Sequence, residues 1–277
     1  MSFFTRLSNG WHIAMNSFKV LQANKQLIIF PVLSGFSLLL VCASFFTGAL
    51  AQAGWQVEAI PDNYSTVVQY SLLFAFYFVN YFVIVFFNVS LMHCTQQYFK
   101  GEKVSIYDGL RFSTTRIVAI LSWALLAATV GTALRILQDG LGKIGKIVIG
   151  LIGIVWNVAT FFVVPVIAYE NENAAGALQR SVQIMKEKWG EKVGASFSFF
   201  MVQLVAFLLL GALAFLVGTF IHPLAGIAVG VLGVVLILAI MSAVQSIFVS
   251  AVYLNVTGDP VTQFHQNLID ELFVTKK

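Results

Sequence analysis

The stretch FFVVPVIAYENENAAGALQRSVQIMKEKWGEKV, residues 161–193, lies between two apolar parts of the chain. It starts apolar, passes through a proline, and becomes a segment dense in charged and amide side chains. Apolar side chains recur at helical spacing within that segment, at Leu178, Val182, Met185 and Trp189. An apolar stripe opposite a charged face is typical of a helix that lies at a membrane surface. The stretch therefore predicts an interfacial helix between membrane spans.

The composition of the whole chain also indicates a membrane protein. Of its 277 residues, 59% are hydrophobic and 10% are charged, whereas soluble domains carry about 25% charged residues. Several uncharged runs exceed the roughly 20 residues that a spanning helix needs. The last run is long enough for two spans, and Pro223 near its middle favours a hairpin. We predict an all-α polytopic bundle in a single membrane domain, residues 1–277, with six spans and a tail helix: about 28–51, 67–92, 117–136, 146–168, 194–220 and 224–253, then 260–273.

The distribution of Lys and Arg predicts how the spans are threaded. Cations gather in the N-terminal segment, after the second span and after the fourth span, and such segments stay in the cytoplasm. Both termini and the segments 93–116 and 170–192 are therefore expected on the cytoplasmic side. Three cations after the third span oppose this orientation, namely Arg135, Lys143 and Lys146. Their long side chains can reach the interface from within a span end.

An internal repeat is a second interpretation of the same pattern. GLRFS at 109–113 and ALQRS at 177–181 share a small residue, a leucine and a serine at the same spacing, and Ser17 has the equivalent place near the N-terminus. The alternative is that any charged loop between spans looks amphipathic. The repeat predicts three units of one amphipathic helix plus two spans, at 1–98, 99–170 and 171–277. The first of these helices would have an apolar stripe of Trp11, Ala14, Met15, Phe18 and Leu21.

The cations of the 170–192 segment are candidate contacts for lipid headgroups. Each is expected to attract the anionic inner leaflet by about 1 kcal/mol. The expected partners are thus membrane lipids, anionic inner-leaflet lipid above all, with a second copy of the chain or another membrane protein as the alternative. No basic-aromatic motif for nucleic acid is present. The candidate headgroup residues are Arg180, Lys186, Lys188 and Lys192.

Amide side chains are the strongest polar groups in the predicted spans: Asn80, Asn88, Asn157, Gln203 and Gln245. They either hydrogen-bond between helices or line a passive pore. Asn157 is expected to face protein or water, near Asn80, Gln203 or Gln245, because an amide facing lipid leaves its groups unpaired. Pro165 is expected to bend the fourth span. Small residues that let helices approach accompany the amides: Gly150, Gly153, Gly226 and Gly230.

The sequence contains no recognisable set of catalytic residues. No nucleophile elbow, phosphate loop or zinc-binding motif is present, and the four histidines are far apart along the chain. No ionisable side chain lies in the core of a predicted span, which argues against ion-coupled transport. We therefore expect no enzyme activity, no cofactor and no metal site.

Several segments resemble a bacterial family of integral membrane proteins of unknown function. They are WHIAMNSFKVLQANKQLIIFPVLSGFSLLL, WALLAATVG, IVWNVATFFVVPVIAYEN, ALQRSVQIMKEKWGE and FHQNLIDELF. More loosely, the plan of amphipathic helix plus hairpin is similar to the membrane domain fused to some glycerophosphodiester phosphodiesterases, without their soluble catalytic domain. The resemblance implies a multi-pass protein of the bacterial inner membrane and supplies no reaction. The leading hypothesis is a non-enzymatic protein that binds lipid or a partner protein; the alternative is a passive pore or permease for a small solute.

Overall fold

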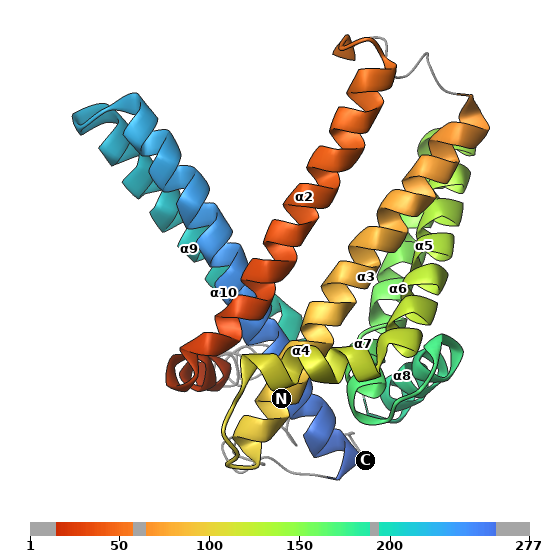
Figure 1. Ribbon diagram of the computed structural model, residues 1–277, viewed down its shortest axis with the longest axis vertical. Helices are drawn as coiled ribbons and strands as arrows, with labels where there is room; N and C mark the ends of the chain where they lie inside the picture. Colours follow the sequence, from red (N-terminus) through yellow and green to blue (C-terminus); the bar gives the residue numbers. More distant parts are fainter. Residues whose placement is uncertain (1–14, 58–64, 189–193, 259–277) are drawn as a thin grey trace. The chain divides into compact units, whose positions relative to one another are not determined.

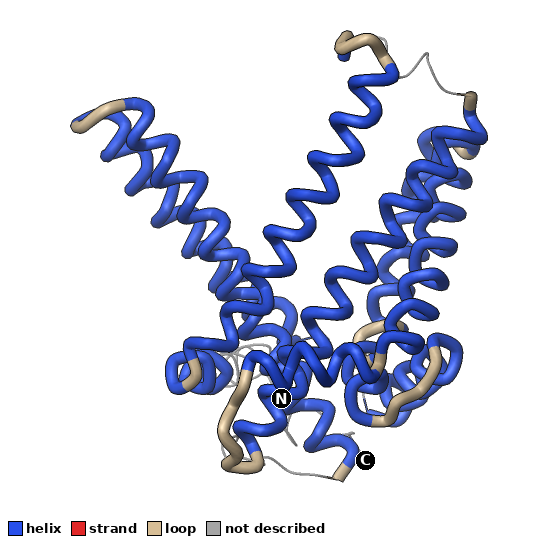
Figure 2. The backbone as a smooth tube through the Cα atoms, viewed as in Figure 1, coloured by secondary structure: helices blue, strands red, loops and turns tan. Residues whose placement is uncertain are grey.

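The computed structural model describes residues 15–57, 65–188 and 194–258, and these ranges contain helices and connecting turns without a strand (Figure 2). The predicted tail helix at 260–273 falls outside the described residues. The chain forms two compact units. Unit 1 contains Met1–Val32, Cys94–Ile106 and Lys186–Lys277, and unit 2 contains Leu33–His93 and Tyr107–Met185. The single membrane domain expected from the sequence stays a prediction.

Six helical segments of the described chain are long and apolar enough to cross a membrane, which is the number predicted. One of these segments is broken and consists of two helices, α6 and α7. The helix α5 has 24 residues, and at 1.5 Å per residue it is about 36 Å long, enough for a hydrocarbon core of about 30 Å. The segments are η1 (Lys25–Ile28) with α2 (Ile29–Gln52), α3 (Thr66–Phe99), α5 (Ile117–Gly140), α6 (Gly142–Ala159) with α7 (Val163–Tyr169), α9 (Gly194–Phe220) and α10 (Pro223–Thr257).

A short helix precedes each pair of long ones, so the predicted order of the repeat is present (Figure 1). The short helices are residues 15–23, α4 (Ile106–Thr115) and α8 (Ala174–Lys188). Within unit 2, α4 and α8 lie at the same end of α3, α5 and α6, and α4 runs across that end (Figure 1). This placement is the one expected of interfacial helices.

The first short helix differs from the predicted stripe. Met15 was expected on the apolar face, but 40% of its surface is exposed, whereas Ser17, Val20 and Leu21 are buried. The face that packs on protein is therefore rotated toward the small residue Ser17, because a small side chain allows closer approach than the flexible methionine. Trp11 and Ala14 lie outside the described residues.

The hairpin predicted at Pro223 joins α9 to α10. His222 is the N-cap of α10, and its Nδ1 atom accepts a hydrogen bond from the Leu224 backbone N–H at 3.2 Å. Pro223 occupies the first turn, where its missing N–H costs no helical hydrogen bond. The turn residues thus end one helix and start the next in the way the sequence indicates.

Glycine residues set the distance between α9 and α10. A Cβ atom on Gly226 would lie 2.6 Å from both the Ala214 carbonyl oxygen and the Gly218 Cα, so the two backbones approach too closely for any side chain. This confirms Gly226 as a packing residue. Gly150 and Gly153 on α6 are different, because a Cβ on either would meet nothing within 4 Å. Among the described residues, therefore, these two glycines do not bring helices together, and the prediction that they do is wrong for this part of the chain.

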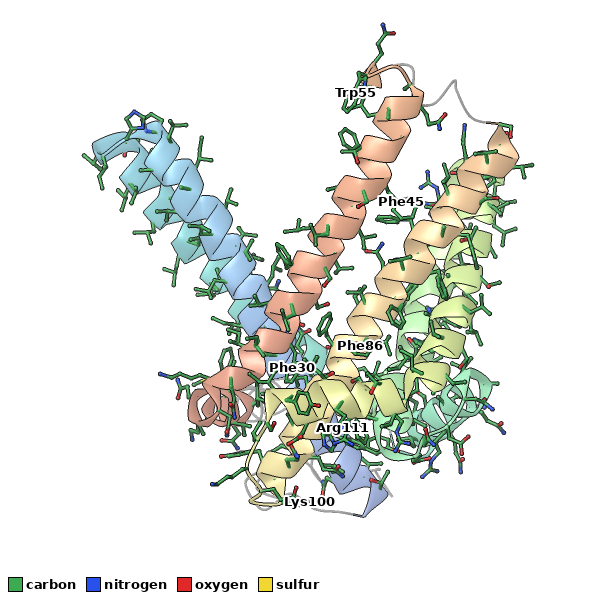
Figure 3. All side chains as sticks on the ribbon, in the orientation of Figure 1. Phe30, Phe45, Trp55, Phe86, Lys100 and Arg111 are labelled. Atoms are coloured by element: carbon green, nitrogen blue, oxygen red, sulfur yellow. The ribbon has the colours of Figure 1, made fainter. Side chains whose placement is uncertain are left out.

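Aromatic rings join the long helices of unit 2. Phe45 of α2 meets Phe76 of α3 edge to face, with ring centroids 5.4 Å apart (Figure 3 labels Phe45). Trp123 of α5 stacks on Trp156 of α6, with centroids 5.9 Å apart and planes within 5° of parallel. The second contact decides which face of α6 is turned toward α5.

Candidate functional site at the short helices of unit 2

A buried serine attaches α4 to the span that precedes it. The Ser113 hydroxyl donates to the Phe86 carbonyl oxygen of α3 at 2.9 Å and lies 2.6 Å from the Ser90 hydroxyl (Figure 3 labels Phe86). Ser113 and Gly109, which is one turn earlier, are both buried. The small residue and the serine of the GLRFS pattern therefore form the contact face of α4.

Ser181 has the corresponding position in α8. Its hydroxyl donates to the Ala159 carbonyl oxygen at 2.7 Å and accepts from the Phe162 backbone N–H at 3.0 Å. These two backbone groups lie on either side of the break between α6 and α7, and Pro165 follows in the first turn of α7. The predicted interruption of the fourth span is thus present, and a side chain from the next short helix satisfies its free backbone groups.

The shared serine pattern therefore has one role in two repeats, namely to fix a short helix to the preceding span. The sequence shows the pattern but not the role, because the acceptor carbonyls are about 20 residues or more away along the chain. Ser17 in the first short helix is also fully buried.

The faces of α8 differ from the predicted stripe. The face packed on unit 2 consists of small and mid-sized residues, while Leu178 and Val182 are half-buried beside it and Trp189 lies outside the described residues. Lys186 is exposed on the far side. Asn173 caps the helix, since its Oδ1 accepts from the Gly176 N–H at 2.9 Å. The buried residues are Ala174, Ala177, Ser181, Ile184 and Met185.

The predicted headgroup cations have different environments. Arg180 donates through Nε to both carboxylate oxygens of Glu170, at 3.0 and 3.2 Å, in a partly exposed ion pair. Lys186 is exposed. Lys192 and the side chain of Lys188 lie outside the part that the structure describes. A partly exposed pair of this kind contributes about 0–1 kcal/mol, so Glu170 leaves Arg180 able to exchange partners.

The predicted amide side chains of unit 2 do not lie together in the structure. Asn80 is half-buried on α3, and its Nδ2 donates back to the Phe76 carbonyl of the same helix at 2.6 Å. Asn88 is half-buried on the same helix. Asn157 is exposed on α6, so of the two predicted alternatives the protein neighbour is absent among the described residues, and a position facing water stays a prediction. The reason is the stacking of Trp156 on α5, because the next residue along a helix points about 100° away.

The other two amides belong to unit 1. Gln203 is half-buried on α9, and Gln245 is exposed on α10. Buried serines of α10, Ser246 and Ser250, lie one and five residues further along that helix.

A cluster that the sequence did not predict lies where α4 meets α5. The rings of His93 and Phe112 stack with centroids 4.0 Å apart and planes within 6° of parallel. The guanidinium carbon of Arg116 lies 5.0 Å from the centroid of Phe112. Burial lowers the pKa of the Arg116 guanidinium from its usual value, but an arginine keeps its charge in proteins. The spacing of Phe112 and Arg116 is visible in the sequence, whereas the position of His93 depends on how α3 and α4 cross.

No cluster of three or more metal-binding side chains occurs among the described residues.

Residues 67–262 match the model of a family described as Family of unknown function (DUF6159). The chain belongs to this family. The matched DUF6159 region contains nearly all of α3 and every later described helix, and so the whole site described above. No curated protein and no solved structure matches the chain.

Proposed function

We propose that this protein is a non-enzymatic component of the bacterial inner membrane that binds anionic lipid at the end of unit 2 formed by α4 and α8. The observation that carries the proposal is that both short helices are fixed to spans by buried serines and present cations at that end. Arg111 of α4 is exposed, and Arg180 of α8 is partly exposed (Figure 3 labels Arg111). A fixed helix at the headgroup level keeps its charges there without further ordering of the backbone.

Aromatic residues at both ends of unit 2 support this placement in the membrane. Trp55 follows α2 at the end away from α4 (Figure 3), and Tyr107 lies at the start of α4; each is 70% exposed. Trp and Tyr are enriched at the two membrane–water interfaces, where their rings meet both apolar and polar surroundings. The helices between these residues would then cross the hydrocarbon core.

Arg135 is one of the cations whose position opposes a cytoplasmic α4, and it forms an ion pair. Arg135 lies near the far end of α5, and its Nε is 3.2 Å from a carboxylate oxygen of Asp139. The Tyr70 hydroxyl also donates to Asp139, at 3.3 Å. An arginine at a span end can reach the interface with its long side chain, so the position of Arg135 is compatible with a cytoplasmic α4 and α8.

The lipid content of the purified protein tests the proposal. Replacing Arg180, Lys186, Lys188 and Lys192 together by Gln should lower co-purifying phosphatidylglycerol and cardiolipin. The expected loss is about 1 kcal/mol of lipid attraction per charge near the surface, and it should shrink at high salt. Arg135→Gln is the control, since it removes a cation from the other end of α5 and should leave the lipid content unchanged. Equal lipid content in the quadruple variant and the wild type would refute the proposal.

A further inference from the structure

The junction between α4 and α5 holds Arg116 in a fixed position. Its backbone N–H donates to the Ser113 carbonyl of α4 at 3.1 Å, and its carbonyl accepts from the Ile120 N–H of α5 at 2.9 Å. The residue therefore belongs to the hydrogen-bonding of both helices. Its side chain lies over the ring of Phe112, which is itself stacked on His93. A guanidinium placed in this way is pre-organised, because backbone and ring together restrict it before any ligand arrives.

The Arg116 guanidinium has an unused donor. Its Nε atom is buried and has no hydrogen-bond partner among the described residues. The ion pairs of the described chain involve Arg135 and Arg180, not Arg116. Asp108 is the acidic residue of α4, but it is exposed and lies about two helical turns before Arg116. A buried N–H without an acceptor is rare in folded proteins and points to a water or an ion that binds there.

The residues around Arg116 indicate which kind of anion would bind to it. The next residues, at the start of α5, are apolar, and among them Val118 is 77% exposed whereas Ala119 and Ile120 are buried. In a membrane protein such a surface faces lipid chains. Arg116 thus lies at the level where the span ends and the lipid phosphates begin. A guanidinium matches a phosphate well, since its planar donors can bind two oxygens at once.

We propose that Arg116, supported by Phe112 and His93, binds the phosphate group of a membrane phospholipid at the α4–α5 junction. This inference rests on the proposed lipid-binding function and names one ligand group and one residue for it. The cations of α8 attract anionic lipid through charge alone, whereas Arg116 holds a phosphate oxygen by directed hydrogen bonds. The contact is with the phosphodiester, so zwitterionic lipid should bind to it as well, at lower affinity than anionic lipid.

Lipid binding by single variants tests the site. Delipidated full-length protein in detergent is titrated with dioleoyl phosphatidylglycerol, dioleoyl phosphatidylcholine or inorganic phosphate, and bound lipid is counted by native mass spectrometry. Arg116→Gln should weaken phosphatidylglycerol binding about tenfold, as expected for the loss of a charged hydrogen bond. Arg116→Lys should weaken it nearly as much, because lysine keeps the charge but lacks the planar fork. Arg135→Gln is the control, since it removes the same charge from the far end of α5 and should change binding less than about threefold.

The outcomes separate this inference from the proposed function. Thermal unfolding of each variant in detergent shows whether it is folded, and Phe112→Leu is a second variant that weakens lipid binding while keeping Arg116. Wild-type affinity in Arg116→Lys, or equal losses in Arg116→Gln and Arg135→Gln, would overturn the site. If lipid binding survives Arg116→Gln but falls in the quadruple α8 variant, this inference fails and the proposed function stands. If wild-type protein binds inorganic phosphate but neither lipid, the ligand is a soluble anion and both fail.

Discussion

At the scale of single residues, the Ser181 hydroxyl makes two hydrogen bonds that no apolar side chain could replace. It connects the Ala159 carbonyl and the Phe162 N–H across the break in the fourth span. Backbone groups freed by a break inside a membrane protein need such partners, because lipid offers none. One buried hydroxyl therefore stabilises both the break and the position of α8.

We predict that Ser181→Ala lowers the free energy of unfolding by about 1–3 kcal/mol, because two buried backbone groups lose their partner. Ser44→Ala is the matched control. The Ser44 hydroxyl is exposed and donates to Leu40 of its own helix at 2.7 Å, so its loss should cost less than about 0.5 kcal/mol. Thermal unfolding in one detergent measures both. Equal stability of the two variants would show that the Ser181 bridge does not stabilise the protein.

The Asn157 side chain shows where reasoning from the sequence fails at this scale. An amide in the middle of a span indicates a polar neighbour, but the sequence does not say which way one residue of an apolar helix points. The stacked pair Trp123 and Trp156 fixes that direction and leaves Asn157 exposed. The helix caps at Asn173 and His222 are different, because each hydrogen bond joins residues two or three positions apart along the chain.

We predict that Asn157→Leu changes the stability of the isolated chain by less than about 0.5 kcal/mol, since its side chain is exposed on α6. Thermal unfolding of the monomeric fraction measures this. Vesicles containing the wild type should pass no small solute. Flux through the wild type that Asn157→Leu alters would instead support a pore lined by this amide.

At the scale of elements, α9 and α10 are joined by close backbone contact. Both helices are apolar on nearly all sides, so hydrophobicity alone does not choose which faces meet in a membrane. Gly226 determines which faces of the two helices meet, because its missing side chain lets α10 approach Ala214 and Gly218 of α9. The spacing of Gly226 and Gly230 predicted this contact. The similar pair Gly150 and Gly153 gave a wrong prediction, since spacing does not reveal whether a partner helix is present.

We predict that Gly226→Ala destabilises the α9–α10 hairpin by about 1–3 kcal/mol, because the new Cβ must push two backbones apart. Gly211 of α9 is the control, since a Cβ there would meet nothing within 4 Å. Gly211→Ala should be neutral or stabilising by up to about 1 kcal/mol, because alanine favours helix over glycine. Proteolysis of the hairpin and thermal unfolding both report the difference. A hairpin that tolerates alanine equally at both positions would contradict the packing described here.

At the scale of the whole molecule, the number of spans follows from runs without charge, because lipid excludes charge over a fixed thickness, whereas the helices extend beyond these runs, as α5 does past Arg135. The order of short and long helices was predictable from the same pattern. Contacts between distant elements were not. The cluster of His93, Phe112 and Arg116 joins α3 to the α4–α5 junction, and no local pattern records that crossing.

The orientation of unit 2 in the membrane is the central claim, because lipid binding by α4 and α8 depends on facing the anionic inner leaflet. Within unit 2, α8 and the C-terminal end of α2 lie at opposite ends (Figure 1). Gln183 belongs to α8, Gln56 follows α2, and both are exposed. With Cys42 and Cys94 replaced by Ala, single variants Gln183→Cys and Gln56→Cys are treated in intact cells with a membrane-impermeant thiol reagent. We predict labelling of Gln56→Cys in intact cells and of Gln183→Cys only after permeabilisation. Labelling of Gln183→Cys from outside intact cells would contradict the account.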